Sequence, residues 1–284
     1  MIVKILLPII LAFIMFSLGL GLKAKDFSRI LKFPIAFGAG LFNQVVLLPL
    51  IALALAHAFG LSNVFAVGLM ILALCPGGVT SNILAKMAGG NAPLSISLTA
   101  VTSLLSILTV PLILAFSVNY FMGEEAPPVD VTRLGITMFL ITAVPVAIGM
   151  ILTSKFPNLV DKIAPKVSRM AVGLFVIIIV AALAKNWEVF SSNLGTLGPV
   201  AVLLNVLMLL LGLVSAKALR LDKQDATTIS IESGVQNGTL AIAVGSIIAT
   251  VDGEILPPET VPAAVYSITM YGVCVPFVFW RKKR

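Results

Sequence analysis

Charged residues are scarce in this chain of 284 amino acids. Only 11% of its residues are Asp, Glu, Lys or Arg, whereas 59% are hydrophobic. A soluble globular domain carries about 25% charged residues, so these few charges cannot coat the surface of a soluble protein of this length. The even spread of Leu, Ile, Val and Ala also excludes disordered, collagen-like and coiled-coil chains. The composition therefore predicts an all-α polytopic membrane protein.

Metal-ligating and nucleophilic side chains are equally few. The chain has two cysteines, Cys75 and Cys274, and a single histidine, His57. Two cysteines within apolar runs cannot form a disulfide framework or a four-ligand zinc site. An intramembrane enzyme needs a nucleophile with its base or a set of metal ligands, and these residues supply neither. We therefore expect a protein that is not an enzyme.

Long apolar runs fill most of the chain. A helix of about 20 apolar residues crosses a bilayer, and nine such runs follow one another with only short loops between them. They predict one transmembrane domain over residues 1–284, without a soluble domain. No small-residue cleavage site follows the first run, so we expect it to be retained rather than removed as a signal peptide. The predicted spans are residues 4–22, 33–58, 62–88, 94–121, 132–153, 166–185, 197–218, 226–250 and 261–280.

Positive charges fall on alternate connections between these spans. Of the 19 basic residues, all but Lys4, Arg133 and Lys185 lie on one side. Because cytoplasmic loops collect Lys and Arg, we expect a protein of the cell inner membrane with its N-terminus outside and its C-terminus in the cytoplasm. The net charge of +7 is spread over five segments, so the partner is the lipid bilayer and not a nucleic acid. The inner set is Lys23, Lys25, Arg29, Lys32, Lys86, Lys155, Lys162, Lys166, Arg169, Lys217, Arg220, Lys223, Arg281, Lys282, Lys283 and Arg284.

Two of the nine spans contain helix-breaking and polar residues near their middle. Residues 75–82 of the third span read Cys-Pro-Gly-Gly-Val-Thr-Ser-Asn, and residues 232–239 of the eighth read Glu-Ser-Gly-Val-Gln-Asn-Gly-Thr. Proline removes a backbone donor and glycine weakens a helix. Unwound backbone is tolerated at membrane depth only where it is buried in protein or lines a water-filled cavity. Both spans are therefore predicted to be broken helices, although the third alone could be a proline-kinked packing helix.

The carboxyl group of Glu232 is the strongest sign of function, because every other acidic residue falls in a predicted loop. A carboxylate near the middle of a bilayer costs at least ~2.5–3.5 kcal/mol on insertion scales. No intramembrane Lys or Arg offers itself as a partner. Glu232 is thus either protonated or paired with a mobile cation, and both alternatives describe a transporter.

The two broken spans resemble each other and run in opposite directions, because they are five spans apart. Residues 78–82 match residues 234–237 when one position is dropped. Transporters built from inverted repeats place such helices in corresponding positions of their two halves. Further polar residues, Gln44, Ser95 and Thr99, could complete a site between the halves. Ser and Thr in membrane helices often bond their own backbone carbonyls, so either role remains open for Ser95 and Thr99.

Three motifs together resemble the bile acid:sodium symporter family. They are Cys-Pro-Gly-Gly-x-x-Ser-Asn at 75–82, Gly-Asn-x-x-Leu-Ser-x-x-x-Thr at 90–99 and Glu-x-Gly-x-Gln-Asn at 232–237. The resemblance extends over essentially the whole chain, including Gln44 and Pro49. It implies a secondary transporter that couples organic-anion uptake to two sodium ions. It also implies inverted repeats, two broken helices that cross, and a core domain that moves against a panel domain, here without the first span of ten-span members.

The resemblance also implies roles for individual residues. The first sodium ion would be held by Ser81, Asn82, Ser95, Thr99 and Glu232. The second would be held by Gln44, Glu232, Ser233, Val235 and Gln236, in part through backbone carbonyls. The substrate, a bile-acid-like or small carboxylate anion, would contact Val79, Thr80 and Asn237.

Two other functions compete with sodium-coupled symport by alternating access. One is a proton-coupled or efflux carrier of similar architecture, such as an arsenite permease, in which Cys75 would act as a thiolate ligand. Against it, the hydroxyl and amide oxygens suit sodium better than a soft ion. The other is the intramembrane enzyme disfavoured above. The expected partners are sodium ions, the organic anion and the lipid bilayer. The sequence suggests no obligatory protein partner.

Overall fold

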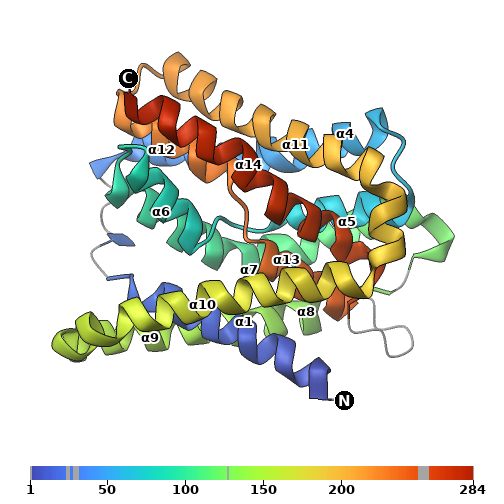
Figure 1. Cartoon of the computed structure of the whole chain (residues 1–284), viewed down its shortest axis with the longest axis horizontal. Helices are drawn as coiled ribbons and strands as arrows, with labels where there is room; N and C mark the ends of the chain where they lie inside the picture. The colour runs from blue at the N-terminus through green and yellow to red at the C-terminus, as the bar shows by residue number, and fades with distance from the viewer. Residues whose placement is uncertain (1, 24–25, 28–31, 127, 249–255, 284) are drawn as a thin grey trace.

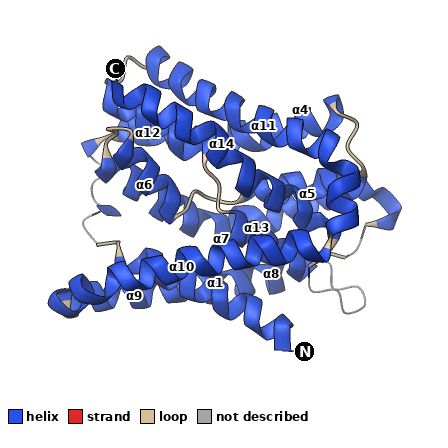
Figure 2. Ribbon diagram, in the orientation of Figure 1, coloured by secondary structure: helices blue, strands red, loops and turns tan. Residues whose placement is uncertain are grey.

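The structure is a computed structural model that describes residues 2–23, 26–27, 32–126, 128–248 and 256–283. Its regular elements in these residues are all helices, as Figure 2 shows. The all-α prediction is therefore confirmed. In chain order the helices are α1 (Ile2–Leu20), α3 (Pro34–Phe42), η2 (Asn43–Leu47), α4 (Leu48–Ala58), α5 (Asn63–Leu74), α6 (Val79–Met87), α7 (Ala92–Met122), η3 (Gly123–Glu125), α8 (Val131–Met138), η4 (Phe139–Ala143), α9 (Val144–Lys155), α10 (Pro157–Lys185), α11 (Trp187–Ala218), α12 (Lys223–Gly234), α13 (Gly238–Ile248), η5 (Pro258–Thr260) and α14 (Val261–Lys283).

Six helical segments are long and apolar enough to cross a membrane. A seventh candidate is the pair α5 and α6, whose axes differ by 63° at the break between them. The apolar part of α1 is shorter, and the pair α12 and α13 begins with a polar turn, so the count of nine spans and the inverted repeats stay predictions. The six segments are Pro34–Ala58, Ala92–Met122, Val131–Lys155, Pro157–Lys185, Trp187–Ala218 and Pro258–Lys283.

The helices pack in two groups. Helices α1, α8, α9 and α10 lie together along the lower part of Figure 1, where α1 packs against α9 and α10. The remaining helices form the second group, in which α11 packs against α12 and α14, and α5 packs against α4 and α7. Helix α1 begins at the lower right of Figure 1, and α14 ends at the upper left. This arrangement places the two interrupted helix pairs inside the second group, next to the first.

Glycines allow the closest approaches between helices. In the first group, a Cβ atom on Gly149 of α9 would lie 2.7 Å from the backbone of Gly19 and Leu20 in α1. In the second group, a Cβ atom on Gly212 of α11 would lie 2.4 Å from Cα of Ser230 in α12. Small residues at helix interfaces let backbones meet in this way and replace the hydrophobic driving force that lipid removes.

Two of the long helices contain a short π-helical turn just before a proline. Leu48 N–H donates to Asn43 O and Val144 N–H to Phe139 O, each five residues back. Pro49 and Pro145 follow these donors directly. Because proline has no N–H and its ring crowds the preceding turn, the helix widens there rather than ending. The turn at residues 43–47 brings Asn43 and Gln44 into the interior.

Several helices extend well beyond the predicted spans. Helix α10 begins at Pro157 and not near residue 166, so Lys162, Lys166 and Arg169 lie on this helix and not in a loop as expected. Helix α11 likewise begins ten residues early, at Trp187. Apolarity marks where a helix meets lipid, whereas Lys, Glu and Ala continue a helix into water. The predictions that concern Lys25, Arg29, residues 249–250, Asp252, Glu254 and Arg284 lie outside the described residues.

The α1–α9 crossing yields a stability prediction. Gly149→Ala should lower the melting temperature of the detergent-purified protein, because the added methyl group would meet the α1 backbone and overpacking costs about 1–3 kcal/mol. Gly173→Ala in α10 is the matched control, since no atom lies within 4 Å of its added Cβ and alanine favours a helix by about 1 kcal/mol over glycine. Equal melting temperatures for the two variants would contradict the proposed close contact.

Candidate functional site

The two interrupted helix pairs meet in the middle of the molecule. Figure 2 shows the connection between α5 and α6 and the connection between α12 and α13 near one another at the centre of the view. They are joined through their backbones, since Asn237 N–H donates to Pro76 O at 2.8 Å. Each break therefore supplies a hydrogen-bond partner to the other, as irregular backbone buried in protein requires.

The local sequence explains both breaks. Helix α5 ends at Leu74, two residues before Pro76, and Gly78 is extended (φ −136°, ψ −171°) before α6 begins at Val79. In the second pair, Asn237 begins α13 with its own side chain. Its Oδ1 accepts hydrogen bonds from Leu240 N–H at 3.1 Å and from the Thr239 hydroxyl at 2.8 Å. The helices are interrupted at residues 75–78 and 235–237, close to where the sequence predicts the two breaks.

Glu232 lies beside the crossing with both carboxylate oxygens in contact with α7. The Ser95 hydroxyl donates to Oε1 at 2.5 Å and the Thr99 hydroxyl donates to Oε2 at 2.7 Å. Asn82 Oδ1 lies 2.7 Å from Ser95 Oγ and 3.3 Å from Thr99 Oγ1. Ser81 Oγ lies 3.4 Å from Thr99 Oγ1. The five residues of the first predicted sodium set are thus brought together by α6, α7 and α12.

This oxygen cluster has more close contacts than protons to serve them. Ser81, Ser95 and Thr99 each carry one hydroxyl proton, and Ser81 already donates to Gly78 O at 2.8 Å. Ser95 and Thr99 each lie within hydrogen-bond distance of both Asn82 Oδ1 and Glu232. Among the described residues no Lys, Arg or His pairs with Glu232. The cluster can therefore accept a cation or a proton without displacing any protein cation.

A second group of polar atoms lies around Gln44, on the other side of the crossing. Gln44 Nε2 donates to Gln236 Oε1 at 2.7 Å and to Cys75 O at 2.8 Å. Gln236 Nε2 in turn donates to Ser233 O at 2.8 Å. The Ser233 hydroxyl is used within its own helix, where it donates to Ile229 O. Gln44 and Gln236 are therefore joined, while Ser233 offers its carbonyl rather than its side chain.

Gly77 connects the two polar groups. A Cβ atom built on it would lie 2.9 Å from Ser81 Oγ, 3.0 Å from Glu232 Oε2 and 3.5 Å from Val235 O. The Val235 carbonyl thus faces the same small space as the carboxylate of Glu232. Only a residue without a side chain leaves this space open.

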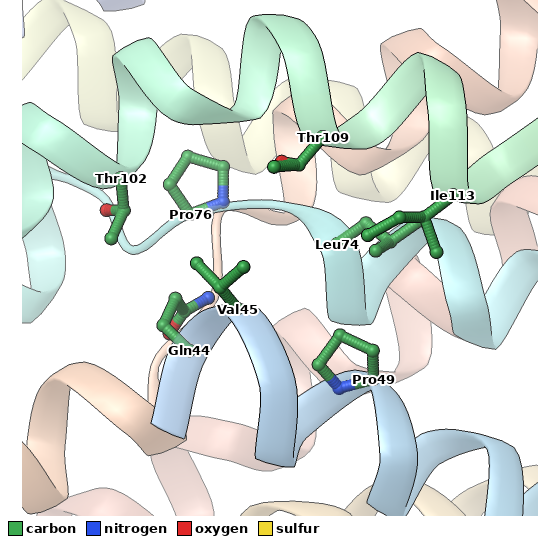
Figure 3. Close-up of a pocket in the computed structure, with 8 residues that line it drawn as sticks. All are labelled: Gln44, Val45, Pro49, Leu74, Pro76, Thr102, Thr109 and Ile113. Atoms are coloured by element: carbon green, nitrogen blue, oxygen red, sulfur yellow. The ribbon is translucent and has the colours of Figure 1, made fainter. Parts of the chain in front are cut away.

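A small cavity of about 10 Å³ adjoins Gln44. Figure 3 shows the Gln44 side chain below Pro76, with Thr102, Thr109 and Ile113 of α7 along the other wall. Such a volume is close to the space that one water molecule needs. The second polar group therefore borders a narrow space that separates η2 and α4 from α7.

A larger cleft lies between the crossing and the first helix group. It has two parts, of about 40 Å³ and about 260 Å³, and both are lined by Val79 of α6 and Ser168 of α10. Thr80 and Asn237 line the inner part beside the crossing, and Lys86 lines the outer part. The three residues predicted to contact substrate, Val79, Thr80 and Asn237, thus share one cleft wall.

Two residues that sequence reasoning missed hold the second break in place. Asn205 of α11 and Tyr266 of α14 both donate to Gly234 O, at 2.5 Å and 2.7 Å. Asn205 also donates to the Tyr266 hydroxyl at 3.1 Å. These bonds satisfy the carbonyl that α12 leaves unpaired where it ends. A signal was present in the sequence, because an amide in the middle of an apolar run needs a hydrogen-bond partner.

The thiol of Cys75 takes no part in either polar group. Its side chain is fully buried within the apolar core, and it is the backbone carbonyl of Cys75 that accepts the hydrogen bond from Gln44. No group of three or more His, Cys, Asp or Glu side chains that could hold a metal ion occurs among the described residues. The oxygens of the crossing are supplied by Ser, Thr, Asn, Gln and one Glu.

The Tyr266 hydroxyl gives a prediction about the break. Tyr266→Phe should lower the free energy of unfolding by about 1–2 kcal/mol, because the buried hydroxyl no longer donates to Gly234 O or accepts from Asn205, while Asn205 still donates to Gly234 O. Tyr120→Phe is the control, since the Tyr120 hydroxyl lies at an exposed position beside His57. Melting temperatures in detergent test the difference. A loss in the Tyr120 variant as large as in the Tyr266 variant would argue against the role of Tyr266.

Comparisons with known proteins find relatives along most of the chain. The family model described as the sodium bile acid symporter family matches residues 8–193. The chain is 30% identical to an uncharacterised sodium-dependent transporter of Bacillus subtilis, over 98% of this chain and 83% of that protein. It is 29% identical to the human ileal sodium/bile acid cotransporter, over 96% of this chain and 77% of that protein. It is also 29% identical to a probable chloroplastic sodium/metabolite cotransporter of rice, over 96% of this chain but only 63% of that protein.

The match of the family model covers well over half of the chain, and the Bacillus relative aligns over nearly all of it. The described helices also include six that are long and apolar enough to cross a membrane. The chain belongs to the sodium bile acid symporter family, whose named relatives are sodium-dependent transporters.

Proposed function

We propose that this protein is a sodium-coupled symporter of an organic anion that works by alternating access. The observation that carries the proposal is the buried Glu232 carboxylate, which is 6% exposed and contacts neutral hydroxyl groups of α7. A negative charge at this depth requires either a proton or a cation. Carboxylate, amide and hydroxyl oxygens are the ligands that hard cations prefer.

The first sodium ion binds between Ser81, Asn82, Ser95, Thr99 and Glu232. Its positive charge balances the carboxylate, and its attraction for lone pairs relieves the shortage of protons among these oxygens. These ligands come from α6, α7 and α12. Sodium binding therefore joins α6 and α12, which flank the two breaks, to the neighbouring helix α7.

The second sodium ion binds on the Gln44 side of the crossing, through Gln44, Glu232, Ser233, Val235 and Gln236. The Gln44 amide turns its oxygen toward the ion, and the carbonyl groups of Ser233 and Val235 complete the set. Two sodium ions and one monovalent anion move one net positive charge in each cycle. A membrane potential then contributes ~2.3 kcal/mol per charge per 100 mV to uptake.

The anion binds in the cleft between the crossing and helices α1 and α10, against Val79, Thr80 and Asn237. The first turns of α6 and α13 border this region through Val79, Thr80 and Thr239, and helix N-termini favour negative charge. The walls also include apolar side chains such as Met15 and Phe175, which suit a bile-acid-like or small carboxylate with an apolar body. Relative movement of the two helix groups then exposes the cleft to one side of the membrane at a time.

The distribution of basic residues supports a C-terminus in the cytoplasm and an N-terminus outside. The larger part of the cleft reaches Lys86 and Gly21, and Lys86 belongs to the basic side. With this topology, the cleft opens toward the cytoplasm in the present conformation.

Glu232→Gln provides the test of sodium coupling. Sodium, but not potassium at equal ionic strength, should raise the melting temperature of the wild-type protein, because it binds only the folded state. Glu232→Gln should abolish this rise and sodium-driven uptake of labelled taurocholate into vesicles. Glu188→Gln, at an exposed acid in the first turn of α11, should leave both unchanged. Uptake that ignores sodium and follows pH would instead identify a proton-coupled carrier.

A pair of neighbouring glycines tests the geometry of the ion cluster. Gly77→Ala should weaken sodium binding by about tenfold or more, because its Cβ would crowd Ser81 Oγ and Glu232 Oε2 and overpacking costs roughly 1–3 kcal/mol. Gly78→Ala should change it little, since the nearest atoms to its Cβ are 3.9 Å away. Sodium titrations followed by melting temperature give both affinities. Similar sodium affinities in the two variants would contradict the placement of the ion beside Gly77.

A further inference from the structure

A pocket of about 540 Å³ at one end of the molecule lies outside the transport site. It is formed where α11 ends, α12 begins and α14 ends, and basic side chains from all three helices line it. Lys217 and Arg220 come from the end of α11 and the turn after it, Lys223 from the first turn of α12, and Arg281 from the last turn of α14. Asp222 is the one acid in the lining, so the net charge is +3.

Most of these basic side chains make no ion pair that would stabilise the fold in the described part of the chain. The carboxylate of Asp222 begins α12, where its Oδ1 accepts Asp225 N–H at 2.8 Å. Arg281 joins α14 to α12 by donating to the Thr227 hydroxyl at 2.9 Å and to Lys223 O at 3.0 Å. In the described part of the chain, the side chains of Lys217, Arg220 and Lys223 make no ion pair. Three cations therefore line the pocket without an ion pair in the described residues, and Asp222 balances only one of the four positive charges of the lining.

The backbone of Arg220 adopts a conformation that is unfavourable for arginine. Its φ is +54°, and it is the only described residue other than glycine with a positive φ. It follows the end of α11, where Leu221 N–H donates to Ala216 O at 3.0 Å, and glycine is the usual residue at this position of a helix end. Other residues are disfavoured in that conformation. Arginine thus occupies a position where glycine would be less strained, which points to a function for its side chain.

The surroundings of the pocket are those of a membrane surface. Val214, Leu219, Phe279 and Trp280 are 61%, 47%, 57% and 39% exposed, although each is apolar or aromatic. The Arg281 guanidinium lies 5.6 Å from the centre of the Trp280 ring. Tryptophan and basic side chains together are typical of the level of the lipid headgroups. A ligand with a negative head and apolar chains fits this combination better than a soluble anion does.

We propose that the pocket formed by Lys217, Arg220 and Lys223 binds the phosphate group of an anionic phospholipid. The phosphate lies among the three cations and the acyl chains run along the exposed apolar side chains of α11 and α14. Basic pockets between membrane helices on the cytoplasmic side are suited to such headgroups. The bound lipid joins the ends of three helices, including α12, which carries Glu232. This inference stands apart from the proposed transport function, because it requires neither sodium nor substrate.

Native mass spectrometry in a neutral detergent tests the proposal with phosphatidylglycerol and phosphatidylcholine as probes. The wild-type protein should retain one phosphatidylglycerol more tightly than any phosphatidylcholine. The triple variant Lys217→Gln, Arg220→Gln and Lys223→Gln should bind it about tenfold or more weakly. The matched control replaces Lys162, Lys166 and Arg169 of α10 by Gln and should bind it as the wild type does. Equal loss in both triple variants would overturn the proposal, because it would mean general surface attraction.

Arg220→Gly separates lipid binding from folding. Its melting temperature in neutral detergent should equal or exceed that of the wild type, because glycine adopts a positive φ without strain. Phosphatidylglycerol should nevertheless raise its melting temperature less than that of the wild type. Wild-type lipid stabilisation in this variant, or a lower melting temperature without lipid, would contradict the role of Arg220. If inorganic phosphate alone stabilises the wild type as much as the lipid does, the ligand is a soluble phosphate and the lipid assignment is wrong.

Discussion

The carboxyl group of Glu232 imposes the constraint on which the rest of the site depends. It is buried where the two helix breaks meet, and it accepts hydrogen bonds from the Ser95 and Thr99 hydroxyl groups of α7. Low-dielectric surroundings strengthen every interaction of such a group and penalise it when it is unpaired. The neighbouring oxygens of Asn82 and Ser81 add lone pairs but no net charge. A site built in this way is poised to gain a positive charge from solution.

The backbone groups freed by the two breaks are divided between structure and site. Gly234 O is held by Asn205 and Tyr266, Pro76 O by Asn237, and Cys75 O by Gln44. These bonds let the chain unwind without leaving buried polar groups unpaired. The carbonyls of Ser233 and Val235 lie nearer the polar groups around Gln236 and Glu232. The same irregular backbone therefore stabilises the fold at one edge and offers oxygens at the other.

Much of the architecture follows from one-dimensional patterns. Apolar runs of sufficient length predict membrane helices, and the combination of proline and glycines at 76–78 predicts the break that bends the α5–α6 pair by 63°. Helix ends were placed less well, as α10 and α11 show, because polar residues that leave the apolar region can continue a helix. The resemblance to a known family brought together Ser81, Asn82, Ser95, Thr99 and Glu232, residues that composition alone could not have grouped. The resemblance did not identify Asn205 and Tyr266, because these residues hydrogen-bond a backbone carbonyl, Gly234 O, and belong to neither predicted sodium set.

The sequence by itself determined that the protein is helical, rich in apolar spans, interrupted twice and provided with one acid away from its predicted loops. These properties reside in the order and type of neighbouring residues. Only the tertiary structure decided that α6, α7 and α12 converge so that Glu232 meets Ser95 and Thr99. It also decided that Gly77 leaves room beside the carboxylate, and that Lys217, Arg220 and Lys223 line one pocket with the end of α14. Such contacts join positions far apart in the chain, 137 residues for Ser95 and Glu232 and 58 residues for Lys223 and Arg281. They arise from helix packing, which local patterns do not encode.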